Sequence, residues 1–515
     1  MLARRILANT AFNTAGRLWL LLVNLFLTPL VLSYLGDRRF ALWALFWTLQ
    51  SWVAFTDLGI GVAVVRSVSS LAGRGGSIGM NTILCTALAF NGGVALLLLF
   101  CSWLFAEPLV VRLHVGAALQ GDALAIALLG PVVFLLLALI SVFDNFLRGR
   151  QRYDLINLVA VLVSLVNATG IWIVLHFGYG ITGLLLSCIV VYLLQLLALG
   201  WSARAIFPAM RLRWRYVRVG RLLRMLPFGI HLQAARLAEL ASYQADKFIL
   251  ALFTPLYFVT AYDVGSKVAA LLRQVPYLLT SAIFPVVAQL HAEGDRDRLW
   301  KIYRCGSKYL WMVSTPLFAG LCVTAPFVLK LWLNHVSPDV LRAVLVLAFG
   351  FWVTVNTSVA YNVGTGMGWS RPVMQLSLVQ AVANVALSWW LAATVGFVGV
   401  LCATAGTLAV TNLWMHWWFC RDFGHRYRKD VVLFARVCAA NLPPVAVVVG
   451  YVWLEGVAGG GATRATAGLA LLWCVGLYGI TYLLAIRLFR LLDEADRGWL
   501  GRFVPALLAQ HLFAG

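Results

Sequence analysis

Ionisable side chains interrupt three otherwise apolar stretches of the sequence. They are Arg17 in the first stretch, Arg236, Glu239, Asp246 and Lys247 in the second, and Asp263, Lys267 and Arg273 in the third. A charge within a membrane-spanning helix costs roughly 2.5–3.5 kcal/mol on the insertion scale, so each group should face water or the interior of a bundle. Arginine suits an anionic ligand because its planar fork pairs with phosphate oxygens in bidentate fashion. We therefore expect four cations to form an anion-binding site. These are Arg17, Arg236, Lys267 and Arg273.

The spacing of these charges favours a common helix face but leaves their roles open. Arg236, Glu239 and Asp246 fall three and ten residues apart, which places them on one side of a helix. The same spacing also allows simple neutralisation, since Arg236 and Glu239, and Asp263 and Lys267, can pair within one turn. Both interpretations hold if the ion pairs open when a substrate arrives. Asp246 and Lys247 are further candidates for exchanging a proton or binding a coupling cation.

The composition indicates which elements must position these charges. Of 515 residues, 62% are hydrophobic and 11% are charged, well below the roughly 25% charged residues of a soluble domain. Uncharged stretches such as Ile83–Phe105 and Leu155–Phe177 are long enough to cross a hydrocarbon core of about 30 Å as helices. Since a helix satisfies its own backbone hydrogen bonds in lipid, we predict an all-α polytopic membrane protein with about 14 transmembrane helices.

The distribution of basic residues predicts the orientation in the membrane. A net charge of +21 would indicate nucleic-acid binding in a soluble protein, but here the cations lie in short segments beside apolar spans. They collect in alternate connections, most densely from Arg204 to Arg224. Because cytoplasmic loops carry the excess of lysine and arginine, we expect both termini in the cytoplasm of a bacterial inner-membrane protein. No cleavable signal and no nucleic-acid partner are expected.

The basic connection also suggests how the chain is divided. It runs from Trp201 to Met225, between the sixth and seventh expected helices. A shift of about 219 residues superposes the segment around Arg17 on that around Arg236, which indicates a repeat of the kind that builds many transporters. We predict a six-helix lobe at 1–203, a basic cytoplasmic linker at 204–225, a second six-helix lobe at 226–430, and two additional helices with a cytoplasmic tail at 431–515.

Several short patches resemble one family of membrane proteins. They are Asn13-Thr14-Ala15-Gly16-Arg17 and residues 57–66 in the first hairpin, Leu147-Arg148-Gly149-Arg150-Gln151-Arg152-Tyr153-Asp154, Asp246-Lys247-Phe248-Ile249-Leu250, and the glycine-containing segment 362–372. With these patches the sequence resembles the polysaccharide-repeat-unit (O-antigen or exopolysaccharide) flippases of the multidrug/oligosaccharidyl-lipid/polysaccharide exporter superfamily. The likeness extends over residues 1–430 as a set of loose motifs.

The resemblance implies two pseudo-symmetric six-helix lobes around a central cavity that opens alternately to each side of the membrane. It implies transport of a polyprenyl-pyrophosphate-linked oligosaccharide, whose pyrophosphate the four cations would bind. Membrane lipids are expected partners, as are a polysaccharide polymerase and export machinery. Asp57 is a further candidate for the substrate cavity if it lies at helix depth, or a helix-end carboxylate in water if it lies at the interface. The nearby Trp47 and Trp52 are candidates for stacking on sugar rings in that cavity or for ordinary packing.

The sequence contains no motif for catalysis. We find no nucleophile elbow, nucleotide-binding loop or metal-ligand pair, and His231 and His416 are isolated within apolar spans, which is typical of core histidines. We expect no enzyme activity, cofactor or metal. Three alternatives stay open: a cation-coupled multidrug exporter of the same superfamily, a peptidoglycan-precursor flippase, and a membrane polysaccharide polymerase or ligase. The excess of buried cations favours an anionic substrate over the cationic drugs of a multidrug exporter.

Overall fold

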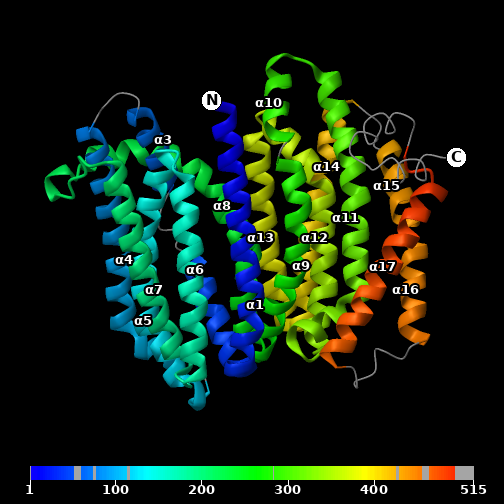
Figure 1. Ribbon diagram of the computed structural model, residues 1–515, viewed down its shortest axis with the longest axis horizontal. Coiled ribbons are helices and arrows are strands. Elements are labelled where there is room, and N and C mark those ends of the chain that lie inside the picture. The colour runs from blue at the N-terminus through cyan, green and yellow to red at the C-terminus, as the bar shows by residue number, and fades with distance from the viewer. Residues whose placement is uncertain are drawn as a thin grey trace. The chain divides into compact units, whose positions relative to one another are not determined.

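The computed structural model describes residues 2–51, 59–72, 77–112, 116–281, 283–424, 428–454 and 463–492. Within these ranges the regular structure is helical throughout, and no strand occurs (Figure 1). Ten of the described helical segments are long and apolar enough to cross a membrane. The prediction of an all-α polytopic membrane protein is therefore confirmed.

The chain divides into two compact units, Met1–Thr260 and Ala261–Gly515. The first unit contains α1 (Leu2–Ser51), α3 (Ile60–Ala72), α4 (Ser77–Arg112), α5 (Gln120–Gly149), α6 (Tyr153–His176), α7 (Gly180–Ile206) and α8 (Val219–Phe253), with short 3-10 turns at Ala117–Leu119 and Trp214–Tyr216. The division falls after α8 and not within the predicted linker at 204–225, because α8 packs against α3, α4 and α1. The repeat of two six-helix lobes stays a prediction.

The second unit begins just inside α9 (Tyr257–Ser281). It continues with α10 (Ile283–Ala292), α11 (Arg296–Leu333), α12 (Pro338–Gly366), α13 (Ser370–Thr394), α14 (Phe397–Asp422), α15 (Arg428–Ala440), α16 (Leu442–Leu454) and α17 (Arg464–Leu488). Hydropathy alone predicts single spans at 256–285 and 432–454. Each is divided between two helices, α9 with α10 and α15 with α16.

A glycine separates the first two expected spans. Gly36 interrupts the 50-residue helix α1 with φ 69° and ψ 169°, a conformation that side chains with a Cβ atom rarely adopt. Just beyond this break, the Thr260 hydroxyl donates to the backbone carbonyl of Asp37 at 2.6 Å. Arg39 pairs with Asp122 at the start of α5, at 2.8 Å. The break therefore allows the two parts of α1 to run in different directions.

A second glycine brings the end of α5 against α3. A Cβ atom on Gly149 would lie 2.8 Å from Cβ of Val68, and the Ser69 hydroxyl donates to the Gly149 carbonyl at 3.0 Å. The chain then turns within three residues to begin α6. Arg152, in this turn, donates to Asp154 at 2.8 Å, and this hydrogen bond raises the pKa of Arg152. The hairpin thus depends on the absence of a side chain at residue 149.

Prolines within two helices leave backbone carbonyls without their helical donors, and neighbouring helices supply the missing bonds. Proline lacks the N–H that would bond four residues back, so Pro131 frees the Ala127 carbonyl and Pro316 frees that of Met312. The Ser102 hydroxyl donates to Ala127 at 2.7 Å, and the Tyr482 hydroxyl donates to Met312 at 2.8 Å. In lipid, where water cannot replace such a bond, this compensation makes a helix-breaking residue acceptable.

The basic connection between α7 and α8 is fastened to α4. The Asn81 side chain donates to the Ala209 carbonyl at 2.9 Å and accepts from the backbone N–H of Arg211 at 2.8 Å. Trp214, within this connection, is 82% exposed. An exposed indole among arginines suits the headgroup layer, where anionic lipids attract cations and tryptophan finds an amphipathic environment.

The last helices pack against α11 (orange to red in Figure 1). Trp311 and Phe327 of α11 share a buried cluster with Val437, Cys474 and Tyr482. The Tyr478 hydroxyl also donates to Asn441 at 2.9 Å, which ties α17 to the junction of α15 and α16. The two C-terminal spans are thus an integrated part of the second unit.

Candidate substrate site

The predicted charges that the structure describes in most detail lie on α9. Lys267 Nζ is 2.8 Å from Asp263 Oδ2, one helical turn away. The aspartate side chain is 5% exposed and the lysine side chain 42%. The expected neutralisation of Lys267 by Asp263 is therefore present. Because the carboxylate is buried and the ammonium group is not, the lysine is the accessible member of the pair.

Two contacts set α9 against α12. A Cβ atom on Gly265 would lie 2.5 Å from Cβ of Ala343, so the helix backbones approach each other at the level of the ion pair. Eight residues further along each helix, the guanidinium carbon of Arg273 lies 5.4 Å from the centroid of the Phe351 ring. Since both contacts advance by the same number of residues, α9 and α12 run side by side in the same direction.

The contact with Phe351 orients the Arg273 side chain, which is half-buried. A cation over an aromatic face is attracted by the ring quadrupole, at roughly 0.5–2 kcal/mol. The N–H donors of a guanidinium group match the spacing of phosphate or carboxylate oxygens. The contact with Phe351 therefore keeps a side chain that can bind an anion at a defined place beside α12.

The other predicted residues fall into two groups. Asp246 and Lys247 on α8, in the first unit, are 0% and 8% exposed, respectively, which agrees with a location inside the bundle. The side chains of Arg17, Arg236 and Glu239, and residues Trp52 and Asp57 entirely, lie outside the part of the chain that the structure describes. The roles expected for these five residues stay predictions.

Trp47 lies in an aromatic cluster of the first unit. Its ring makes edge contacts with Trp43 at 5.7 Å, Phe46 at 5.3 Å and Tyr192 at 6.5 Å between centroids. Edge-to-face pairs of this kind stabilise a core by about 0.5–1.5 kcal/mol each. These contacts are sufficient to explain Trp47 as a packing residue of the first unit. Its expected stacking on a sugar ring stays a prediction.

The ion pair on α9 is expected to stabilise the folded protein. The variant Lys267→Met removes the ammonium group and deprives the buried Asp263 carboxylate of this partner. Removing one member of a fully buried pair costs about 3–5 kcal/mol. Because the lysine is partly exposed, we expect about 1–3 kcal/mol. The double variant Asp263→Asn with Lys267→Met should recover most of the loss, measured as apparent melting temperature in detergent.

The exposed pair Arg342–Asp339, at 2.9 Å, provides the control. Its side chains are 60% and 21% exposed, so Arg342→Met should change the free energy of unfolding by less than about 1 kcal/mol. If Lys267→Met and the double variant had equal melting temperatures, burial of the Asp263 carboxylate without Lys267 would cost no stability, and the prediction would be wrong.

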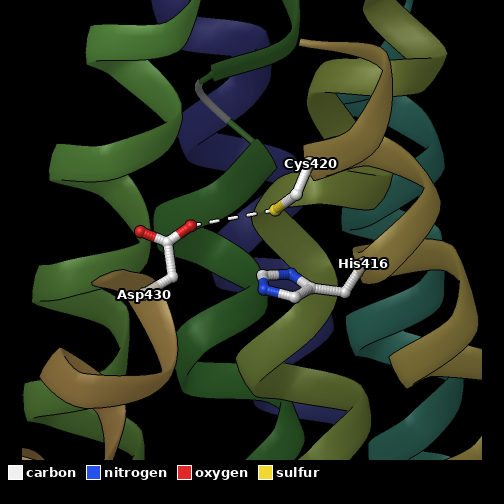
Figure 2. A group of neighbouring side chains, drawn as sticks. All are labelled: His416, Cys420 and Asp430. Atoms are coloured by element: carbon white, nitrogen blue, oxygen red, sulfur yellow. Dashed lines mark hydrogen bonds between the residues drawn. The ribbon is translucent and has the colours of Figure 1, made fainter. Parts of the chain in front are cut away.

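The structure brings together a set of residues that the sequence did not connect. In the described ranges, one group could hold a metal ion: His416 and Cys420 on α14 with Asp430 on α15, all buried (Figure 2). Tyr303 of α11 hydrogen-bonds to this group. His416 and Cys420 are four residues apart, which places them on one helix face. This spacing is the one feature of the sequence that could have indicated a pair of metal ligands. The expectation of no metal ligands overlooked this pair.

Comparison with solved structures identifies the fold. The chain is similar to a multidrug resistance MATE family transporter of the MOP superfamily, seen inward-facing, with 17% identity and a TM-score of 0.67 over 78% of this chain and 94% of that one. It is also similar to the lipid II flippase MurJ, with 12% identity and a TM-score of 0.69 over 94% and 98% of the two chains. A MOP superfamily transporter from Pyrococcus furiosus, described with a binding pocket of reverse polarity, gives 16% identity and a TM-score of 0.57 over 82% and 94%.

Sequence comparison identifies the family. No curated protein sequence matches the chain closely. Residues 39–335, however, match the sequence profile of a family described as "Polysaccharide biosynthesis protein". The matched segment runs from the second part of α1 to the end of α11 and therefore includes the whole of α9. Because this match covers more than half of the chain, the protein is a member of the polysaccharide biosynthesis protein family, with the multi-pass membrane fold of the MATE and MurJ transporters.

Proposed function

We propose that the protein flips a polyprenyl-pyrophosphate-linked oligosaccharide repeat unit from the cytoplasmic to the outer leaflet of the bacterial inner membrane. It does so by alternating access, and the exported unit serves the synthesis of a cell-surface polysaccharide such as lipopolysaccharide or exopolysaccharide. The observation that carries the proposal is membership of a polysaccharide biosynthesis family. The likeness in fold to a lipid II flippase supports transport rather than catalysis as its contribution to that synthesis.

The cations of α9 support an anionic substrate. A pyrophosphate that leaves the headgroup layer loses its hydration and needs matching positive charge, which intramembrane arginine and lysine supply. Lys267 is partly accessible beside Asp263, and Arg273 is oriented by Phe351. In the proposed mechanism these groups, with Arg17 and Arg236, bind the pyrophosphate while the polyprenyl tail stays in lipid. The proposed ion-pair or coupling groups are Glu239, Asp246, Lys247 and Asp263.

The basic connection between α7 and α8 supports a cytoplasmic location for that end of the first unit. Its arginines and the exposed Trp214 would contact anionic headgroups, each cation contributing about 1 kcal/mol. With the connection on that side, alternation along the chain supports the proposal that both termini are cytoplasmic. A polysaccharide polymerase and the export machinery are the proposed partners on the outer side.

A cation-coupled drug exporter is the second candidate, favoured by the likeness in fold to MATE transporters. Organic cations need acidic groups at the binding site, whereas on α9 two cations accompany one buried carboxylate. A peptidoglycan-precursor flippase shares the preference for pyrophosphate and differs in the sugar that it transports. A polymerase or ligase would require a catalytic site of its own.

The test is deletion of the chromosomal gene, followed by analysis of surface polysaccharide and of lipid-linked intermediates in the cytoplasmic leaflet. We expect loss of surface polymer and accumulation of the lipid-linked repeat unit, both reversed by the intact gene on a plasmid. If the amount of surface polymer were unchanged and drug sensitivity increased, the drug-exporter function would be supported instead of the flippase function. Accumulation of lipid II would indicate the peptidoglycan precursor instead. Lipid-linked repeat units that reach the outer leaflet but remain unpolymerised would indicate a polymerase or ligase.

A further inference from the structure

Four polar side chains meet where α11, α14 and α15 converge. His416 and Cys420 lie one turn apart on α14, and Asp430 lies in the first turn of α15, with the imidazole, thiol and carboxylate groups directed toward one another (Figure 2). Their ligand atoms all lie within 4.8 Å of one another. The Tyr303 hydroxyl oxygen, from α11, is 3.2 Å from His416 Nε2, 3.4 Å from Cys420 Sγ and 3.2 Å from Asp430 Oδ2.

These distances resemble those of a tetrahedral metal site. A regular tetrahedron with metal–ligand bonds of about 2.0–2.3 Å has edges of about 3.3–3.8 Å between its donor atoms. The three distances from the tyrosine oxygen and the 3.7 Å between Cys420 Sγ and Asp430 Oδ2 are four of the six edges. The remaining two edges, from the imidazole to the thiol and to the carboxylate, are no longer than 4.8 Å.

Hydrogen bonds link the four groups when no ion is bound. The Asp430 carboxylate accepts from the Tyr303 hydroxyl and, at 3.7 Å, from the Cys420 thiol, which is a weak donor. His416 Nε2 lies within hydrogen-bond distance of the tyrosine oxygen. A cation at the centre would instead accept one lone pair from each of the four groups. Convergence of nitrogen, sulfur and oxygen donors on one point is the arrangement that a metal ion requires.

We infer that His416, Cys420, Asp430 and Tyr303 form a zinc site. Thiolate and imidazole ligands in tetrahedral geometry select zinc among the common divalent ions, whereas magnesium and calcium prefer oxygen ligands only. Binding releases the Cys420 proton to water, so the thiolate and the Asp430 carboxylate together neutralise the doubly charged ion. His416 and the Tyr303 hydroxyl bind as neutral ligands. The filled site carries no net charge, which suits a group buried among membrane-spanning helices.

The surroundings of the site favour a structural role for the ion. Tyr303 is 0% exposed, and its ring lies 4.8 Å from the rings of both Trp300 and Phe419. Arg296 pairs with Asp422 at 2.9 Å where α11 begins and α14 ends. Structural zinc sites are closed by four protein ligands and contribute directly to folding. The ion would connect the start of α15 to α14 and α11, and so fasten the last helices to the bundle.

The experiment measures zinc in the full-length protein, purified in detergent without a polyhistidine tag. We expect about one zinc ion per chain by mass spectrometry of the elements. Removal by a chelator should lower the apparent melting temperature, and added zinc should restore it. Cobalt substitution should produce the absorption of a thiolate-bound tetrahedral ion in the wild type and not in Cys420→Ser. Loss of the tyrosine ligand in Tyr303→Phe should weaken zinc binding by at least the roughly 10–100-fold that follows loss of a residue that only orients a ligand.

The variant Cys402→Ser is the matched control, since Cys402 is an exposed cysteine on the same helix. It should retain zinc, whereas His416→Ala and Cys420→Ser should not. The measurements on the wild type do not depend on whether these variants fold. Chelated wild-type protein that binds neither zinc nor cobalt would overturn the inference, as would equal loss of zinc from Cys402→Ser and Cys420→Ser.

Discussion

Replacing Arg17 and Arg273 together by glutamate is expected to abolish export of the lipid-linked sugar while the chain still inserts into the membrane. Removing a partner of a buried charge typically costs about 2–5 kcal/mol, which corresponds to about 30- to 5,000-fold in binding. Reversal of the charge adds repulsion of the pyrophosphate. The measurement is complementation of the deletion strain, with surface polymer and lipid-linked intermediates quantified against the amount of inserted protein.

Two further variants separate a binding role from a general effect of charge. Lys301→Glu changes an exposed residue at the start of α11 and should leave export unchanged. Arg273→Lys preserves the charge but loses the planar fork and its packing on Phe351, so export should fall to an intermediate level. Normal export from the double glutamate variant would remove the cationic site from the proposed mechanism without affecting the family assignment.

Substituting leucine for Gly265 is expected to separate α9 from α12 and to lower both stability and export. Even a Cβ atom at this residue would lie 2.5 Å from Cβ of Ala343 and 3.2 Å from the Val340 carbonyl, and the latter is backbone that cannot rotate away. Overpacking of this kind costs about 1–3 kcal/mol and more for a long side chain. Since Asp263, Lys267 and Arg273 share this helix, displacement also disturbs their positions. Melting temperature and complementation of the deletion strain measure the two effects.

Gly406 on α14 provides the matched substitution. A Cβ atom there meets nothing within 4 Å, so Gly406→Leu adds the same side chain to a helix interior without a clash. We expect it to insert, melt and export like the wild type, or to gain slightly from improved helix propensity. If Gly265→Leu behaved in the same way, the close approach of α9 to α12 would not matter for the protein.

The helices could be predicted from the sequence because lipid imposes a simple length requirement. The uncharged stretches Ile83–Phe105 and Leu155–Phe177 correspond to α4 and α6, since about 20 apolar residues suffice to cross the bilayer. The boundary expected between the first two spans agrees with the break at Gly36. The prediction was less precise near the C-terminus, where the division between α15 and α16 depends on a local conformation that hydropathy does not report.

The contacts between helices could not be predicted, for a physical reason. In a soluble protein the apolar side of a helix is the buried side, but a membrane helix faces lipid with residues as apolar as those of the core. Hydropathy and spacing provide no means of pairing Gly265 with Ala343, or Tyr303 with His416 at a separation of 113 residues. Only the pair Asp263–Lys267, which is local to one turn, followed from spacing.

The bond between Tyr482 and the Met312 carbonyl has a consequence for biogenesis. The two residues are separated by 170 positions, and ribosomes add about 5–20 residues per second, so roughly 10–30 s pass between their synthesis. During that interval the carbonyl that Pro316 frees has neither its helical donor nor its eventual tyrosine partner. Nascent α11 must therefore remain beside the insertion machinery, beside water or beside another polar group until α17 arrives. A chain released before α17 would carry an unsatisfied carbonyl in the bilayer, a defect that membrane quality-control proteases can recognise.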